Sequence, residues 1–536
     1  MFRFYRFFIV NLIKTQYFAD NRLDKTGMAD YRLNNFTPYP DKKINFILPA
    51  VFVWGLALIL ILALFFYENE SDNFLGSYYL MPWCLLTGAV IAAPSLYLYY
   101  KNSFNLFHPL VFAAWSYFFP AFFVGGFVLS AGFSQPFFLN FVQDERYNLP
   151  LTLVYVMLGY IGLSVGFFLP FGRKIGERIN RWMPEWNWKP EQLLAPGLLL
   201  LAIGLFNTIF AFAAGVIGFQ QVEEIGIFDG TIFLLTLFWL EAAFLLWLMV
   251  FRTKELNFNH YLVIGLLLVI SLGKSAIQGN RGSLIQVFIL IAFAFVSSGR
   301  TIKFQHKMLG GILLALALLV GMIYGTTFRN IKQSQERVSI DEYVGNIFEA
   351  FGKISDQGVF ASMEEGFVAL AERIDAVSSL AVVVSNYEQL APYEESYGLD
   401  NNIWKDSITF LIPRVVWNDK PLATDPSKYG DLYFNFSENS FTLTPIGDLL
   451  RNFGPVGIPL GMILLGFFIR IFYACLIENQ SVSFWRATVY YMLLTSISYE
   501  GSYGLIIPYL IKVGFIAVLG LLIVWFFVRN SSYKRS

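Results

Sequence analysis

Long runs of apolar residues are the feature of this sequence that most restricts its fold. A bilayer core of about 30 Å is crossed by roughly 20 apolar residues in a helix. Runs of this length recur along the 536 residues, of which 56% are hydrophobic and only 14% are charged. This pattern predicts an all-α polytopic membrane protein.

The same length criterion predicts about twelve transmembrane helices. They are expected near residues 44–67, 77–99, 109–131, 149–171, 193–217, 231–251, 259–278, 282–298, 308–328, 453–476, 484–500 and 505–528. A polar interval, 329–446, separates the ninth from the tenth. The predicted parts are an N-terminal segment (1–43), transmembrane helices 1–9 (44–328), a loop domain (329–446), membrane re-entry with helices 10–12 (447–528) and a tail (529–536).

The charges predict which side each part occupies. The interval 329–446 holds 9 Lys and Arg against 18 Asp and Glu, which leaves 29 basic and 20 acidic residues elsewhere. Lys and Arg are retained on the cytoplasmic side. We therefore expect the polar interval to be extracytoplasmic and both termini to be cytoplasmic. The opening stretch, MFRFYRFFIVNLIK, lacks a signal-peptide cleavage site and predicts an interfacial amphipathic helix.

The polar interval is expected to be a folded helical domain, because apolar residues recur in it at steps of three and four. One such face runs from Phe360 to Val377, and Arg373 lies beside it.

Several familiar chemistries are excluded by residue type. Cys84 and Cys475 each lie inside an apolar block, so neither a disulfide framework nor a Cys-based zinc site is expected. The three histidines fall in or beside predicted cytoplasmic loops, which argues against a His-based metal site or catalytic triad. No P-loop or dinucleotide fingerprint is present, and no cofactor is expected. A reaction on the outer face would need a substrate that arrives already activated.

Basic residues on the predicted outer side are the main candidates for binding an anion, since Lys and Arg are usually kept off that side. Arginine suits phosphate because its planar donor fork binds two oxygens at once. Lipid headgroup contact is an alternative for Arg329 and Arg451, and internal ion pairs are an alternative for Arg373 and Arg414. The candidates, with Lys274 as a lesser one, are Arg281 in the turn GNRG, Arg329, Arg373, Arg414, Lys420 and Arg451.

Three acids stand out. Asp448 precedes Arg451 by three residues, which places both on one helix face. That pair is either an ordinary ion pair, worth a few tenths of a kcal/mol on an exposed helix, or part of a site in which Asp448 acts as a base or binds a sugar hydroxyl. Glu500, in SYEGSYG, is a second candidate. Glu241 stands alone within the sixth predicted span, where it is either protonated or paired.

Three motifs carry a family resemblance: NRG at 280–282, IPRVVWNDKP at 412–421 and GDLLRNFGPVG at 447–457. With the predicted topology, the chain resembles the bacterial oligosaccharide repeat-unit polymerases, the O-antigen or exopolysaccharide polymerases of Wzy type. The resemblance covers residues 281–466 best and the first half in topology only. The family's acid after Gly447 is often Glu, whereas this chain has the shorter Asp448. The matching positions are Ile412, Pro413, Arg414, Trp417, Lys420, Pro421, Gly447, Asp448, Asn452, Phe453 and Gly454.

The resemblance implies a metal-independent glycosyltransferase of the bacterial cytoplasmic membrane, with a fold similar to the glycosyltransferase C class. Its substrates would be undecaprenyl-diphosphate-linked glycans that meet on the outer face. A hydroxyl of one repeat unit would attack the anomeric carbon of the growing chain and release lipid diphosphate.

The resemblance assigns the diphosphate to Arg281, Arg373 and Arg414, supported by Lys420 and Arg451. Asp448, or else Glu500, would activate the acceptor. Membrane lipids, a chain-length regulator and a flippase are the expected partners, and nucleic acid is not. A ligase that transfers the glycan to another acceptor, and a flippase or exporter of lipid-linked sugars, are the alternatives.

Overall fold

The computed structural model describes residues 77–133, 136–217, 228–278, 282–300, 304–332, 340–357, 374–414, 416–417, 419–420, 426–436, 441–478 and 482–533. All of them belong to one compact unit that spans 33–536. The regular structure in this described part is helical throughout.

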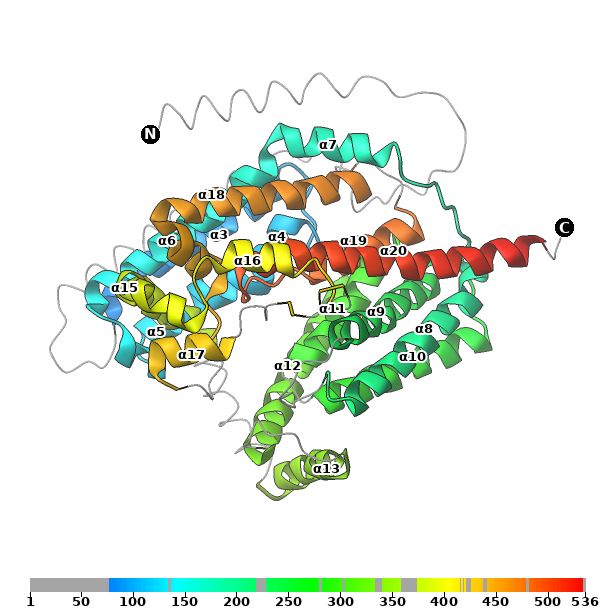
Figure 1. Cartoon of the computed structure of the whole chain (residues 1–536). Coiled ribbons are helices and arrows are strands. Elements are labelled where there is room, and N and C mark those ends of the chain that lie inside the picture. Colours follow the sequence, from blue (N-terminus) through cyan, green and yellow to red (C-terminus); the bar gives the residue numbers. More distant parts are fainter. Residues whose placement is uncertain are drawn as a thin grey trace. The chain divides into compact units, whose positions relative to one another are not determined.

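The helices follow one another along the chain without an intervening sheet in the described ranges (Figure 1). Their bounds are η1 Tyr78–Leu80, α3 Met81–Tyr100, α4 Pro109–Ala113, the π-helical η2 Ala114–Val124, α5 Gly125–Ser130, η3 Phe137–Phe141, α6 Glu145–Phe168, α7 Pro170–Asn180, α8 Pro190–Ala213, α9 Asp229–Arg252, α10 Phe258–Gln278, α11 Gly282–Ser297, α12 Phe304–Lys332, α13 Ile340–Gln357, α15 Ala376–Glu394, η4 Glu395–Tyr397, α16 Asn402–Thr409, α17 Pro426–Phe434, α18 Thr444–Leu476, α19 Phe484–Thr495 and α20 Tyr503–Tyr533.

Nine of the described helices are long and apolar enough to cross a membrane, which confirms a helical polytopic membrane protein. Each predicted span from 77–99 onward overlaps a helix, and the first, 44–67, lies outside the described residues. Two predicted spans fall on helices shorter than the usual crossing length, namely α11 with 16 residues and α19 with 12.

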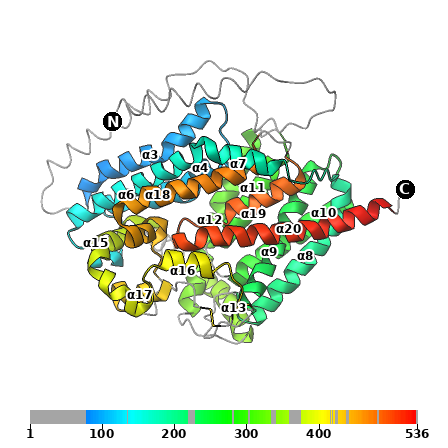
Figure 2. The ribbon, with the colours of Figure 1, turned by 45° about the horizontal axis from the view of Figure 1, so that its top comes forward.

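Glycines permit a close helix contact between α6 and α18, which run side by side in both views (Figure 1, Figure 2). A side chain added at Gly166 would overlap the carbonyl oxygen of Ile463, and one added at Gly466 would overlap that of Leu163. Small residues let membrane helices approach at backbone distance, where van der Waals packing is strongest. The close packing of α6 and α18 therefore supports the residues at the start of α18.

The buried apolar residues of the bundle form two large clusters. One surrounds α6, α15 and the first part of α18, and the other surrounds α8, α9, α19 and α20. In the second cluster, Gly204 of α8 lies against the backbone of Trp239 on α9. The long helices α18 and α20 also contact each other, which connects the two clusters.

The polar interval contributes directly to the first cluster through α15. Val377, Ala381 and Val382 of this helix are fully buried, and α15 packs against α6 and α18. The described part of the interval is therefore integrated with the bundle instead of standing apart from it.

The predicted continuous helical face from Phe360 to Val377 is wrong at its C-terminal end. The backbone of Asp375 is extended, and a new helix begins at Ala376. The Asp375 carboxylate accepts hydrogen bonds from the backbone N–H groups of Val377 and Ser378, at 2.9 and 3.2 Å. Such capping ends one helix and starts another regardless of apolar periodicity. Residues 358–373, including most of that face, lie outside the described residues.

Asp375 also makes stability depend on pH. Burial raises its pKa from 3.8 to about 6, against the opposing hydrogen bonds from Ser378 and Val377. The folded state therefore holds the proton more tightly than the unfolded state, so this contribution is complete below about pH 4 and is lost as pH rises through about 6. Asn at this position still caps the helix but does not titrate. Between pH 4 and 7, the free energy of unfolding of Asp375→Asn should therefore fall less than that of the wild type, by up to about 3 kcal/mol. Thermal unfolding of both proteins across that range measures it, and parallel curves would contradict it.

Candidate functional site

Two groups of side chains bring together the sequence-predicted residues that the structure describes. The first is a buried network around Asp448 and Arg451. The second is a cation cluster, which we define as Lys420 and Lys512 over the ring of Phe410 together with Arg414, whose charge reaches Lys420. The predicted residues Arg281 and Arg373 lie outside the described residues, and of Arg329 only its place in α12 is described.

The start of α18 carries the network because the helix is broken at Gly454. This glycine has φ 68° and ψ −171°, and Pro455 follows it. Residues with side chains rarely adopt that backbone conformation. The break separates a short segment, 444–453, from the long apolar helix behind it. Gly447 in this short segment lies against Leu380 and Val383 of α15, where an added side chain would be in tight contact.

Asp448 is fully buried, and both of its carboxylate oxygens accept hydrogen bonds. Oδ2 accepts from the backbone N–H groups of Tyr503 and Gly504 at 2.9 and 3.4 Å. These are the first residues of α20, whose N–H groups have no partner within the helix and whose N-terminus favours negative charge. Asp448 therefore holds the start of α20 in place.

The other oxygen of Asp448 faces three donors. Oδ1 accepts from Asn402 at 3.1 Å, from Asn452 at 3.3 Å and from Arg451 at 3.4 Å. The predicted proximity of Asp448 and Arg451 on one helix face is confirmed. The pair is buried instead of exposed. Removing either partner would therefore leave an uncompensated buried charge, which costs more than the loss of a surface ion pair.

Arg451 has a fully buried side chain whose two terminal nitrogens are shared among several acceptors. Nη1 forms an ion pair with Glu394 at 2.7 Å and donates to the carbonyl oxygen of Leu399 at 3.0 Å. Nη2 donates to the side-chain oxygen of Asn402 and to the hydroxyl of Tyr429, the latter at 2.7 Å. The planar guanidinium thus joins α15, α16, α17 and α18 at one point.

Burial shapes the electrostatics of this network. It raises the pKa of Glu394, and the neighbouring Arg451 opposes that rise. It also raises the pKa of Tyr429 well above its usual value, with the charge of Asp448 adding to the effect. Tyr429 therefore remains a neutral hydroxyl that accepts from Arg451. The network is a structural junction in which one guanidinium contacts two carboxylates, those of Asp448 and Glu394.

In the motif IPRVVWNDKP, the described residues form local backbone hydrogen bonds between Pro413 and Lys420. The backbone N–H groups of Val416 and Trp417 donate to the carbonyl oxygen of Pro413, at 3.0 and 3.2 Å, and the N–H of Lys420 donates to that of Trp417 at 3.2 Å. Lys420 has a lowered pKa, caused first by burial and then by the positive charge of Arg414. Arg414 and Lys420 therefore lie within electrostatic reach of each other, and their predicted role in binding diphosphate stays a prediction.

A third cation, Lys512 of α20, completes the cluster and was not predicted. Its Nζ lies 3.6 Å from the centre of the Phe410 ring, and the Nζ of Lys420 lies 5.8 Å from the same ring. Both contacts are cation–π interactions. Lys512 and Lys420 also lie within electrostatic reach of each other.

Among the described residues, positive charge exceeds negative charge around the cation cluster. In the described part of the chain, no carboxylate forms an ion pair with Arg414, Lys420 or Lys512. The acid whose charge reaches Lys420 is Asp406, buried one turn before Phe410. Three partly exposed cations with this surplus of positive charge suit a ligand that carries two or more negative charges.

Helix α16 connects the network to the cluster. Asn402 at its start belongs to the network, and Phe410 directly follows its last residue. The helix lies beside the start of α20 in both views (Figure 1, Figure 2). Gly504 permits this approach, since an added side chain would meet the backbone of Ile403 at 2.9 Å. The buried network therefore positions α20, which carries Lys512, and α16, which leads into the segment with Arg414 and Lys420.

Glu500, the second predicted acid, is exposed on the loop between α19 and α20. It precedes by three residues the point where Asp448 holds α20. Of the two predicted acids, Asp448 is enclosed by donors, whereas Glu500 is open to solvent. Their catalytic roles stay predictions.

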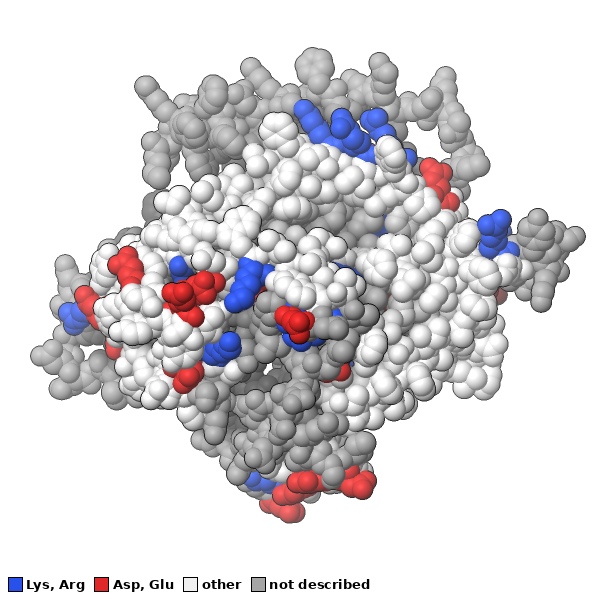
Figure 3. All heavy atoms as spheres, in the orientation of Figure 1, with Lys and Arg blue, Asp and Glu red and all other residues white. Residues whose placement is uncertain are grey.

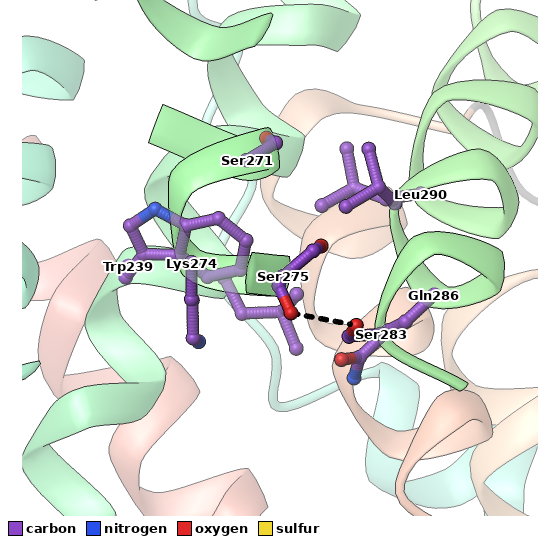
Figure 4. Close-up of a pocket in the computed structure, with 9 residues that line it drawn as sticks. Trp239, Ser271, Lys274, Ser275, Ser283, Gln286 and Leu290 are labelled. Carbon is purple, nitrogen blue, oxygen red and sulfur yellow. Dashed lines mark hydrogen bonds between the residues drawn. The ribbon is translucent and has the colours of Figure 1, made fainter. Parts of the chain in front are cut away.

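Lys274 lines a small cavity between α9, α10 and α11 (Figure 4). Its Nζ lies 3.9 Å from the centre of the Trp239 ring. Across the cavity, the hydroxyl of Ser283 donates to the carbonyl oxygen of Ser275 at 3.3 Å (Figure 4). The volume of about 10 Å³ is close to what a single water needs. The cavity is too small for a sugar or a phosphate group.

Glu241 is fully buried within α9, and neither carboxylate oxygen has a hydrogen-bond partner among the described residues. It lies against Gly520 of α20, where an added side chain would overlap its carboxyl group. Of the two alternatives that the sequence left open, protonation fits this environment, because an unpaired buried charge is costly in a membrane.

Charged side chains gather over α15, α16 and α17, whereas the face over α8, α9 and α10 is almost free of them (Figure 3). In the ranges that the structure describes, no group of three or more His, Cys, Asp or Glu residues is placed to hold a metal ion.

A family model described as a domain of unknown function, DUF8712, matches residues 151–479. The chain belongs to this family. The DUF8712 region includes Arg414, Lys420, Asp448 and Arg451, whereas Lys512 lies beyond it. No curated protein and no solved structure matches the chain.

Proposed function

We propose that this protein is a polymerase that joins undecaprenyl-diphosphate-linked oligosaccharide repeat units on the outer face of the bacterial cytoplasmic membrane. The observation that carries the proposal is the cation cluster, which includes two of the motif residues, Arg414 and Lys420, close to a third cation from α20. The resemblance of the sequence motifs to the Wzy-type polymerases supports it.

In the proposed reaction, a hydroxyl oxygen of the incoming repeat unit attacks the anomeric carbon of the growing chain. The bond from that carbon to the diphosphate oxygen breaks, and the lipid diphosphate leaves with the bonding electrons. Negative charge gathers on the leaving group, and fixed cations aimed at developing charge lower the barrier. Arg414, Lys420 and Lys512 supply those cations.

The proton of the attacking hydroxyl requires a base. Glu500 is exposed on the loop before α20, so it is open to a substrate hydroxyl. Asp448 holds that loop's end through Tyr503 and Gly504. We assign proton removal to Glu500 and the positioning of its loop to Asp448, with Arg451 balancing the charge of Asp448.

The proposal includes the full topology expected from the sequence. Twelve spans place both termini in the cytoplasm and the interval 329–446 outside, in an architecture similar to the glycosyltransferase C class. The unbalanced positive charge of the cation cluster then faces the side on which lipid-linked glycans are joined.

Two experiments separate this function from its alternatives. Purified protein in liposomes should lengthen lipid-linked glycans without any ion gradient, whereas an exporter would leave their length unchanged. A deletion strain should retain single repeat units on the final acceptor. Loss of all attached glycan from that strain would instead indicate a ligase.

A further inference from the structure

Helix α7 is a short amphipathic helix that starts where a membrane-spanning helix ends. The span α6 ends at Phe168, Leu169 is extended, and Pro170 begins α7. With 11 residues, α7 is too short to cross a bilayer. It therefore lies close to the boundary between lipid and water.

Two glycines fix how α7 is rotated on the bundle. Gly172 and Gly176 are buried and face α18, where added side chains would meet Arg470 at 2.9 Å and the carbonyl oxygen of Ile471 at 2.6 Å. On another side, Arg173 bonds Glu177 at 2.9 Å, so the single acid of α7 is neutralised. The side of α7 that does not pack on α18 therefore faces away from the bundle in a fixed orientation.

Those remaining faces carry an apolar stripe beside a basic stripe. Phe171, Ile175 and Ile179 are 64%, 41% and 41% exposed, and Trp182 just after the helix is 87% exposed. At the neighbouring helical positions lie Lys174, Arg178 and Arg181, which are exposed and form no ion pair with a described carboxylate. Lys and Arg side chains gather over α7 on the molecular surface (Figure 3).

Tryptophans mark the same region as a membrane interface. Trp186 stacks on Trp188 at 5.4 Å and on Trp525, near the end of α20, at 6.3 Å between ring centres. Arg529 lies over the Trp525 ring at 5.3 Å. Tryptophan concentrates at the level of lipid headgroups. The stripes of α7 therefore face the bilayer surface.

We propose that α7 is a binding site for anionic phospholipids. Phe171, Ile175, Ile179 and Trp182 enter the boundary of the acyl region, and Lys174, Arg178 and Arg181 bind phosphate groups at the surface. The unpaired positive charge distinguishes anionic from zwitterionic lipid, because each Lys or Arg near an anionic surface adds to the attraction. This site is independent of the proposed polymerase reaction.

The test measures the thermal unfolding midpoint of the purified full-length protein in detergent as phosphatidylglycerol or phosphatidylcholine is added. Phosphatidylglycerol should raise the midpoint more than phosphatidylcholine does. The triple variant Lys174→Gln, Arg178→Gln, Arg181→Gln should need about tenfold more phosphatidylglycerol for half of the effect, or more. An equal response of the wild type to both lipids would overturn the proposal.

The control makes the same charge change at Arg146, Lys353 and Lys428, which lie on α6, α13 and α17. That triple Gln variant should keep the wild-type response, and an equal loss in both variants would also overturn the proposal. A nitroxide on Trp182→Cys provides a second readout, since Cys84 and Cys475 are buried. The label should be relaxed more by oxygen than by a water-soluble nickel complex, and the reverse would contradict insertion.

Discussion

Arg451→Met is expected to lower the free energy of unfolding by about 3–5 kcal/mol, the range for removing one partner of a buried ion pair. Methionine fills part of the space but leaves Glu394 and Asp448 buried without their cation. Asn402 and Tyr429 lose a donor at the same time. Because the network joins α15, α16, α17 and α18, its loss should loosen the whole region around the cation cluster.

Thermal or denaturant unfolding in detergent measures this effect. Arg451→Lys should recover only part of the lost stability, since an ammonium group cannot reproduce the planar fork. Arg146→Met, at an exposed position near the start of α6, is the matched control and should change stability by less than about 0.5 kcal/mol. Equal stability of Arg451→Met and Arg146→Met would show that the network does not hold this region together.

Arg414→Gln and Lys420→Gln are expected to reduce the rate of glycan elongation by about 10²–10³ each, the range for removing one group that stabilises developing negative charge. Neither side chain forms an ion pair with a described carboxylate, so the folded state should tolerate both changes. Unfolding midpoints close to that of the wild type would establish that the loss is chemical.

Lys428→Gln is the matched control for this experiment. Lys428 is an exposed cation on the neighbouring helix α17, and its Nζ donates to the carbonyl oxygen of Tyr397 at 3.1 Å. The same charge change there should leave elongation within a few-fold of the wild type. Normal elongation by both cluster variants would remove the cation cluster from the reaction.

Helix positions followed from the sequence because the length of an apolar run is a local property. The runs that became α3, α6 and α9 have the length of a bilayer crossing, and no tertiary information was needed to find them. The predicted helical face through Ile374 and Val377 failed because Asp375 caps a new helix. Apolar periodicity alone does not reveal such a cap.

The candidate site was predictable only where its members are close in sequence. Asp448 and Arg451 are three residues apart on one helix, and Arg414 and Lys420 are six residues apart in one motif. Their partners come from separate elements. Glu394, Asn402 and Tyr429 lie on three separate helices and meet at Arg451 through tertiary packing. Single polar residues in a polar interval carry no sequence signal of such a contact.

Lys512 is another member of the site whose neighbours are distant in sequence. It lies near the start of the last apolar run. A lone lysine at such a position is usually explained by contact with lipid headgroups. Its position over Phe410 depends on how Asp448 holds the start of α20, which the sequence does not indicate. The sequence indicated a possible functional role for Lys512 only through the presence of a lysine in an apolar span.

The most direct test of the cation cluster as a diphosphate site is the affinity of purified Lys512→Gln for undecaprenyl diphosphate, measured beside the wild type, Arg414→Gln and Lys428→Gln. If Arg414, Lys420 and Lys512 form one site, Lys512→Gln should weaken binding at least tenfold, as Arg414→Gln does, while Lys428→Gln binds like the wild type. Wild-type affinity in Lys512→Gln would contradict the account.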